Sequence, residues 1–257
     1  MLNPHVTEVH VPAHVYGILG LVVLLAFPSW QGVLAFLTFN LWFSAFGMSI
    51  GFHRYFTHRS FKTSTFWRRF MFIGGTLAGQ GSVIFWTALH RQHHPASDTE
   101  LDIHTPRKGL WHAYMGWIFT LDPEQVSMAR ASDLIRDPWC RWTHRNYSHI
   151  MWGWWMTLTL AACVPVLRPW ACGAMVAGMW SIHQEALINS VCHDSRFGSR
   201  PHATSDDSRD VHWLRYLTWG QSLHNTHHRY PADASFGEHD TGYSIIRLIR
   251  TKHEVSV

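Results

Sequence analysis

The stretch VLAFLTFNLWFSAFGMSIGFHRYFTH, residues 33–58, joins a long apolar run directly to two histidines. Residues 33–52 of this stretch carry no charge, and about 20 such residues let a helix cross the ~30 Å hydrocarbon core of a bilayer. Apolar runs of similar length occur at residues 13–30, 149–167 and 169–190, and short turns join the runs in two pairs. The sequence therefore predicts an all-α integral membrane protein, a single domain over residues 1–257 with four transmembrane helices in two hairpins.

Basic residues are distributed unevenly between the expected loops. Of the 21 Lys and Arg, none precedes Arg54, and only Arg168 lies in a turn between paired runs. Because Lys and Arg are enriched in cytoplasmic loops, we expect residues 53–148 and 191–257 to form a helical cap on the cytoplasmic side. The chain has 18 Arg and 3 Lys, which is typical of a GC-rich coding sequence and favours a bacterial source. The expected location is therefore a bacterial inner membrane. No nucleic-acid partner is expected, since the basic residues follow the connectors without a reading helix or a stacking platform.

Nine histidines fall in four clusters within or beside these cytoplasmic segments. In HRQHH (90–94) and HNTHH (224–228) they are spaced i, i+3 and i+4, which places them on one face of a helix. The four cysteines form no CxxC pair, so thiolate ligation is not indicated. The expected metal ligands are His53, His58, His90, His93, His94, His193, His224, His227 and His228.

Nine imidazoles exceed the four ligands of one structural zinc ion, and the number favours two metal ions. Such a set suits zinc, copper, nickel or iron. Two-metal hydrolysis normally uses bridging carboxylates, which the four clusters lack, so dioxygen chemistry on a lipid is the favoured interpretation. A histidine-rich membrane metal-binding or transport protein is the alternative from another class.

Four motifs carry a resemblance that covers about residues 51–231. HRYFTHRSFK (53–62), HRQHHPASDTELDIH (90–104), NSVCH (189–193) and HNTHHRYP (224–231), in this order, resemble the membrane fatty-acyl desaturase family, especially its bacterial and animal acyl-CoA branch. The resemblance implies a cytoplasmic diiron centre of two Fe2+ ions with the nine histidines as ligands. The reaction it implies is desaturation of a fatty acyl-CoA or acyl-ACP, with O2 as co-substrate.

The resemblance also implies roles for residues outside the histidine clusters. Asn189 matches a family asparagine that holds a metal-bound water, and Arg107 with Lys108 matches a basic pair that meets the phosphates of coenzyme A. We further expect Trp86 to line the acyl tunnel. No haem-binding HPGG, flavin or NAD motif is present, so we expect an external electron donor of the ferredoxin or cytochrome b5 type.

Four residues in three segments depart from the family pattern close to the site. Glu185 and Ala186 stand where Thr-Trp is usual, Gln221 replaces a Glu, and Tyr114 replaces a His. Because a charge is costly in a lipid tunnel, we expect Glu185 and Ala186 to adapt the substrate site to an unusual acyl chain. Hydroxylation and triple-bond formation by the same oxidant remain open. Residues 66–89 are expected to form a helix lying at the membrane interface.

Overall fold

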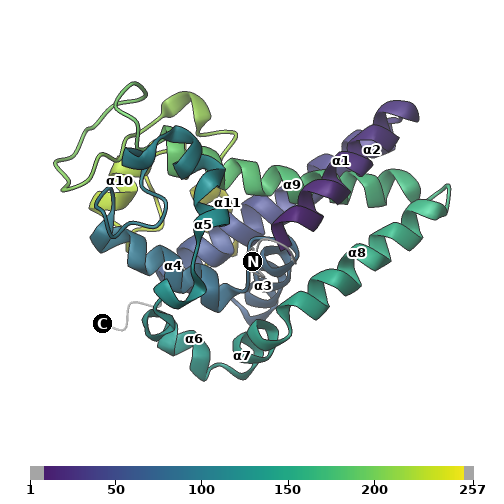
Figure 1. The fold of residues 1–257 in the computed structure, drawn as a ribbon, viewed down its shortest axis with the longest axis horizontal. Helices are drawn as coiled ribbons and strands as arrows, with labels where there is room; N and C mark the ends of the chain where they lie inside the picture. The colour runs from purple at the N-terminus through teal and green to yellow at the C-terminus, as the bar shows by residue number, and fades with distance from the viewer. Residues whose placement is uncertain (1–8, 252–257) are drawn as a thin grey trace.

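The computed structural model describes residues 9–251, and these are helical apart from turns, loops and isolated β-bridges. Each of the four apolar runs is a helix. The helices are α1 (Val11–Ala26), α2 (Trp30–Asn40) continuing into the π-helical η2 (Leu41–Thr57), α8 (Tyr147–Cys163) and α9 (Arg168–Val191). Figure 1 shows α1, α2, α8 and α9 extending to one side, away from α4 and α10.

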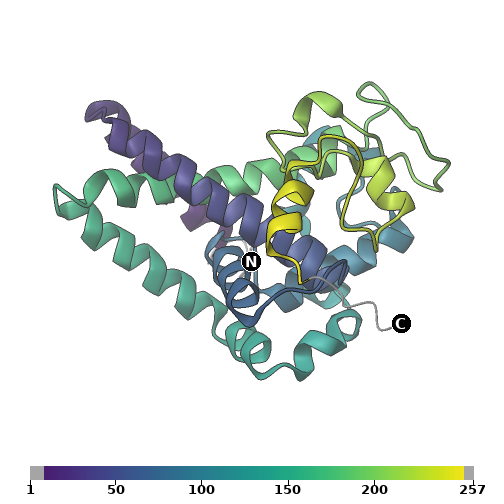
Figure 2. The same ribbon diagram turned by 180° about the vertical axis from the view of Figure 1, so that it is seen from behind.

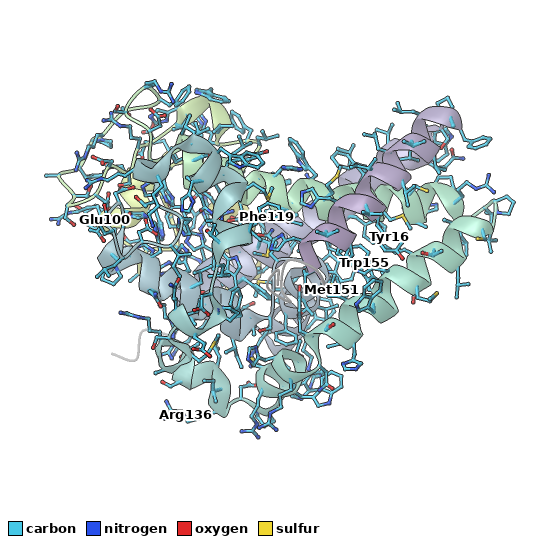
Figure 3. The ribbon with its side chains drawn as sticks, in the orientation of Figure 1. Tyr16, Glu100, Phe119, Arg136, Met151 and Trp155 are labelled. Atoms are coloured by element: carbon cyan, nitrogen blue, oxygen red, sulfur yellow. The ribbon has the colours of Figure 1, made fainter. Side chains whose placement is uncertain are left out.

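Small residues allow α9 to pack closely against α1 and α2. A Cβ on Gly173 would lie 2.5 Å from Cβ of Ala35, and one on Gly20 would lie 2.9 Å from the carbonyl oxygen of Cys172. Between α1 and α8, Tyr16 stacks on Trp155 with ring centroids 5.2 Å apart (Figure 3). Among the described residues, one helix, Trp30–Thr57, is long and apolar enough to cross a membrane, and α1 is a shorter apolar helix. The crossing of all four helices remains a prediction.

The π-helical geometry of η2 brings the first two histidines to the same side of the chain. A π-helix forms i→i+5 hydrogen bonds. At the end of η2 the backbone N of His58 donates such a bond to the carbonyl oxygen of His53, at 3.1 Å. The five-residue spacing in HRYFTH therefore fits this helix type.

The expectation of a single helix over residues 66–89 is wrong, while its position at the membrane interface stays a prediction. The segment folds as α3 (Thr65–Leu77) and the start of α4 (Val83–Ala96). The connecting turn contains Gly79 and Gly81, whose φ angles of +78° and +99° are conformations that glycine adopts without strain. Ser82 then caps α4 by accepting a hydrogen bond from the backbone N of Phe85. The break redirects the chain and allows α4 to carry HRQHH into the site.

The rest of the chain surrounds α4. The short elements after it are η3 (Pro106–Lys108), η4 (His112–Gly116), α5 (Trp117–Thr120), η5 (Pro123–Gln125), η6 (Met128–Ala131), α6 (Ser132–Arg136) and α7 (Pro138–Arg145). After α9 come η7 (His212–Leu214), α10 (His224–Arg229) and α11 (Thr241–Ile249). Viewed from behind, α10 and α11 lie at the same end of the molecule as η2 and α4 (Figure 2). This end holds all nine histidines.

Candidate metal centre and substrate cavity

Five histidines converge through their Nε2 atoms and form what we call the first cluster: His53, His58, His90, His94 and His227. The Nε2–Nε2 distances are 3.0 Å for His53–His227, His58–His90 and His90–His94, and 3.1 Å for His94–His227. Each neutral Nε2 carries either one hydrogen or one lone pair, so hydrogen bonds satisfy such a chain of contacts poorly. Nitrogens that share a metal ion at about 2 Å are instead roughly 3 Å apart. The donor set and its spacing fit a metal ion.

The second cluster contains His93, His193, His224 and His228, whose nearest ring nitrogens lie within 4.8 Å of one another. Here the opposite nitrogen, Nδ1, is already engaged in all four rings: that of His224 faces the carbonyl oxygen of Gln221 at 3.3 Å, and the other three face carboxylates. His193 Nδ1 donates to Asp98 at 2.9 Å, His93 Nδ1 to Asp102 at 3.1 Å, and His228 Nδ1 to Asp206 at 2.8 Å.

The carboxylates fix how these rings are oriented. A carboxylate only accepts, so each Nδ1 carries the hydrogen and each Nε2 presents its lone pair. The Nε2 atoms of His193 and His228 are buried and have no hydrogen-bond partner among the described residues. Carboxylate–histidine pairs of this kind are typical of the layer behind metal ligands. The residues of the second cluster therefore also fit a metal ion.

The two clusters adjoin one another. Three ring nitrogens lie within 4.8 Å of one another, one each from His94, His227 and His228. Because His228 belongs to the second cluster and the other two residues to the first, this contact links the clusters. The structure thus brings together all nine histidines expected from the sequence. They come from the end of η2, from α4, from the turn after α9 and from α10.

Burial keeps most of these rings neutral, as metal ligation requires. It lowers the pKa of His90, His94 and His227 well below 6.5, with neighbouring histidines adding to the effect. His193 differs. Burial alone would lower its pKa, but the hydrogen bond and charge of Asp98 outweigh burial and raise it.

Two arginines position the histidine-bearing elements. The Arg91 guanidinium donates to the carbonyl oxygen of Thr57 at 2.8 Å and to Asp133 at 2.6 Å, which ties α4 to the end of η2. Arg54 is fully buried and donates to both carboxylate oxygens of Asp240, at 3.1 and 2.9 Å. This second pair holds the start of α11 beside the first histidine cluster.

Several site residues were not found from the sequence. The sequence suggests no role for Asp98, Asp102 or Asp206, although the first two lie inside the motif HRQHHPASDTELDIH. His104 ends that segment and packs on His93 with ring centroids 4.4 Å apart. Burial lowers the pKa of His104 to about 4, against the opposing charge of Asp102. The local sequence signal for this pair is DIH, residues 102–104, an Asp and a His two positions apart.

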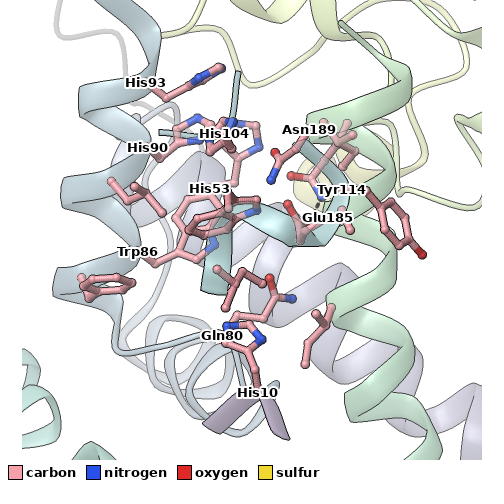
Figure 4. A pocket seen from close by; sticks show the side chains of 18 of the residues that line it. His10, His53, Gln80, Trp86, His90, His93, His104, Tyr114, Glu185 and Asn189 are labelled. Carbon is pink, nitrogen blue, oxygen red and sulfur yellow. Dashed lines mark hydrogen bonds between the residues drawn. The ribbon is translucent and has the colours of Figure 1, made fainter. Parts of the chain in front are cut away.

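A narrow cavity of about 60 Å3 adjoins both clusters. Trp86 and His90 on α4 face Glu185 and Asn189 on α9 across it (Figure 4). Ala186 also lines it. The Trp86 ring stacks on His90, with centroids 4.9 Å apart. The cavity therefore places apolar and polar groups directly beside the candidate metal ligands.

The basic pair lies elsewhere. Arg107 and Lys108 form the exposed η3 turn, and neither lines this cavity. Arg107 forms an exposed ion pair with Asp207 at 3.4 Å, while Lys108 borders a separate surface cleft of about 680 Å3. The structure leaves these two residues outside the candidate active site, where they are accessible from solvent.

Comparison with known proteins identifies the class. The fatty acid desaturase family model matches residues 28–255, and the chain belongs to this family. It is 33% identical to a hex-5-enoyl-[acyl-carrier protein] acetylenase of Moorena producens, over 82% of this chain and 72% of the relative. It is 35% identical to an sn-1 stearoyl-lipid 9-desaturase of Synechocystis sp., over 84% and 68%. It is 32% identical to an acyl-CoA C20 Delta5-desaturase of Anemone leveillei, over 92% and 78%. The protein is an oxidoreductase that acts on fatty acyl chains.

Proposed function

We propose that the protein is an O2-dependent desaturase of a fatty acyl thioester, acyl-CoA or acyl-ACP, with a diiron centre held by the nine histidines. Two hydrogens leave adjacent carbons of the chain, and a double bond forms between these carbons. Dioxygen is reduced to two waters by the two hydrogens of the substrate together with two electrons from an external donor and two protons from solvent. The observation that carries the proposal is the convergence of nine ring nitrogens onto two adjoining clusters beside a cavity.

Bound iron would supply the redox chemistry that removes hydrogen from an unactivated methylene. The protein's own residues orient and enclose the reactants. Asp98, Asp102 and Asp206 hold three histidines with Nε2 directed into the site. Trp86 forms one wall and keeps water from the chain, and Asn189 holds a water molecule at the edge of the site.

The membrane arrangement is part of the same proposal. Four helices, α1, α2 with η2, α8 and α9, cross the bilayer as two hairpins, and the histidine-bearing end faces the cytoplasm. This orientation gives a soluble donor of the ferredoxin or cytochrome b5 type access to the site. Arg107 and Lys108 lie on the exposed η3 turn, where they meet the phosphate groups of the thioester carrier.

Triple-bond formation is the second candidate. The relative from Moorena producens is named as an acetylenase of a hex-5-enoyl acyl-carrier protein, and it covers 82% of this chain. The same residues would then act on a chain that already contains a double bond. Glu185 and Ala186, which line the cavity, also favour an unusual chain.

The test is expression in a desaturase-deficient bacterium supplied with iron, followed by mass spectrometry of total acyl chains. We expect a new alkene or alkyne product that His93→Ala abolishes. His149→Ala, which changes an exposed histidine on α8, is the matched control and should retain the product. Purified wild-type protein should contain two irons per chain. A protein that binds no iron and yields no product would refute the proposal.

A further inference from the structure

The candidate substrate cavity has a carboxyl group in its wall. Glu185 extends from α9 into the space between α9 and α4 (Figure 4). Its Oε1 accepts a hydrogen bond from Gln221 Nε2 at 2.6 Å. Within residues 9–251 its other oxygen, Oε2, accepts no hydrogen bond, and no Lys, Arg or His forms an ion pair with it. The Glu185 carboxyl group therefore lines the cavity with one oxygen, Oε2, free to accept a hydrogen bond.

The cation whose charge acts on Glu185 is bound by other groups. Arg54 acts on Glu185 only through its charge, because its guanidinium is bound by Asp240, Ser49 and the carbonyl oxygen of Trp219. Glu185 is partly buried and lines the cavity. Its hydrogen bond from a neutral amide leaves the carboxyl group able to accept a further hydrogen bond. A ligand in the cavity can supply that donor.

The space beside Glu185 can accept a substituent on a chain. Its neighbour Ala186 lines the same wall and contributes only a methyl group. Gln80 and Asn189 also line the cavity, so the wall around Glu185 is more polar than a plain methylene chain requires. This combination of a small side chain and a hydrogen-bonding wall suits a chain that carries one polar group.

An apolar groove adjoins the same cavity. His10, Tyr114 and Ile118 line both spaces. The groove has a volume of about 340 Å3 and is lined otherwise by α1, Trp111, Met115, Phe119 and His183. A ligand that fills both spaces is therefore largely apolar, and its polar group lies near the histidine clusters. This excludes a small polar metabolite and favours a substituted acyl chain.

We propose that Glu185, supported by Gln221, selects an acyl chain that bears a hydrogen-bond-donating substituent, a hydroxyl or an amino group, near the carbons that are oxidised. The inference rests on the proposed function and narrows its substrate class. Glu185 accepts the hydrogen bond through Oε2, and Ala186 provides room for the substituent. The apolar end of the chain enters the groove beside Tyr114.

The test is competition binding to the purified protein in detergent, with tritiated decanoyl-pantetheine as the reference ligand. The competitors are the unsubstituted thioester, its monohydroxy isomers at successive carbons, and the corresponding monoamino chains. A hydrogen bond to a carboxylate is worth about 10- to 100-fold in affinity. We expect at least one substituted chain to bind wild type about tenfold or more tightly than the unsubstituted chain. Preference for the amino chain would show that the donor is charged, and preference for the hydroxyl chain that it is neutral.

Variants separate recognition from folding. Glu185→Leu should abolish the preference, whereas Glu185→Gln, which keeps an accepting oxygen, should retain part of the hydroxyl preference. Glu124→Leu, at an exposed position outside the cavity, should leave it unchanged. Thermal unfolding of each variant verifies that it is folded. Equal affinity of wild type for substituted and unsubstituted chains overturns the inference, as does a preference that persists in Glu185→Leu.

Metal content and turnover distinguish this inference from the proposed function. Wild type that binds two irons and desaturates unsubstituted and substituted chains equally well would refute the role of Glu185 alone. Wild type that binds no iron and turns over neither chain would refute the proposed function. Failure of every chain to bind would refute both.

Discussion

Replacing Asp98 by asparagine removes one negative charge from behind the second histidine cluster and changes little else. Asp98 has a φ of +60°, a left-handed conformation that asparagine also adopts readily, so the backbone is preserved. Its Oδ2 accepts hydrogen bonds from His193 Nδ1 at 2.9 Å and from the backbone N of Asp207 at 2.7 Å. An asparagine oxygen can take the same place, but the bond to His193 then lacks charge assistance.

The expected effect is confined to one metal. Loss of a carboxylate behind a ligating histidine costs about 10- to 100-fold in metal affinity, or about 1.4–2.8 kcal/mol. Only the second cluster contains His193. At a chelator concentration that leaves wild type fully loaded, Asp98→Asn should therefore fall from two metals per chain to about one.

Metal content after dialysis against graded chelator, measured by mass spectrometry, is the assay. Titration of metal-free protein with Co2+ gives an independent spectroscopic reading of each site. Asp233→Asn, at an exposed carboxylate outside the site, is the matched control and should behave as wild type. Equal loss of both metals, or unchanged affinity for both, would show that Asp98 does not act through His193.

Three further predictions concern stability. Arg54→Met leaves Asp240 as an uncompensated buried charge and should lower the free energy of unfolding by about 3–5 kcal/mol. Arg54→Lys should recover only part of this loss. An unchanged thermal midpoint in Arg54→Met would contradict the role of the pair. Burial lowers the pKa of His104 from 6.5 to about 4, so in metal-free protein its contribution is complete above pH 6.5 and is lost as the pH falls to about 4. Between pH 7 and 4, His104→Gln should therefore lose roughly 3 kcal/mol less stability than wild type, and equal losses in acid unfolding curves would refute this. Gly75→Ala would place a Cβ 2.4 Å from the buried Phe52 ring and should lower the free energy of unfolding by about 1–3 kcal/mol. Gly153→Ala, whose Cβ would meet no atom within 4 Å, should raise it by up to about 1 kcal/mol. Thermal unfolding of the two variants compares them directly.

Much of the fold was predictable because apolar runs and histidine spacings are local signals. All four apolar runs are helical, with ends within a few residues of the expected limits. The i, i+3, i+4 pattern in HRQHH and HNTHH likewise predicts which rings share a helix face. The break at Gly79 and Gly81 was missed because the apolar content of residues 66–89 continues through it. The apolar content of a segment does not reveal a turn that forms because two glycines adopt positive φ angles.

The surroundings of the histidines were less predictable because they depend on contacts between distant segments. Asp98 and His193 are separated by 95 residues, and Arg54 and Asp240 by 186. No local sequence pattern indicates that these residues pair with one another. The five-residue spacing in HRYFTH also has no natural reading on an α-helix, and it becomes regular only in the π-helical η2.

The pairing of Arg54 with Asp240 sets an order of events during synthesis. The first histidines emerge from the ribosome long before residues 224–240, which supply three further histidines of the two clusters and the partner of Arg54. Until that segment arrives, Arg54 has no carboxylate and both clusters are incomplete. A nascent chain therefore cannot assemble the full ligand set early. Under the proposed function, metal capture would be deferred until nearly all of the chain has been made and folded, and so would exposure of the cell to oxidising chemistry.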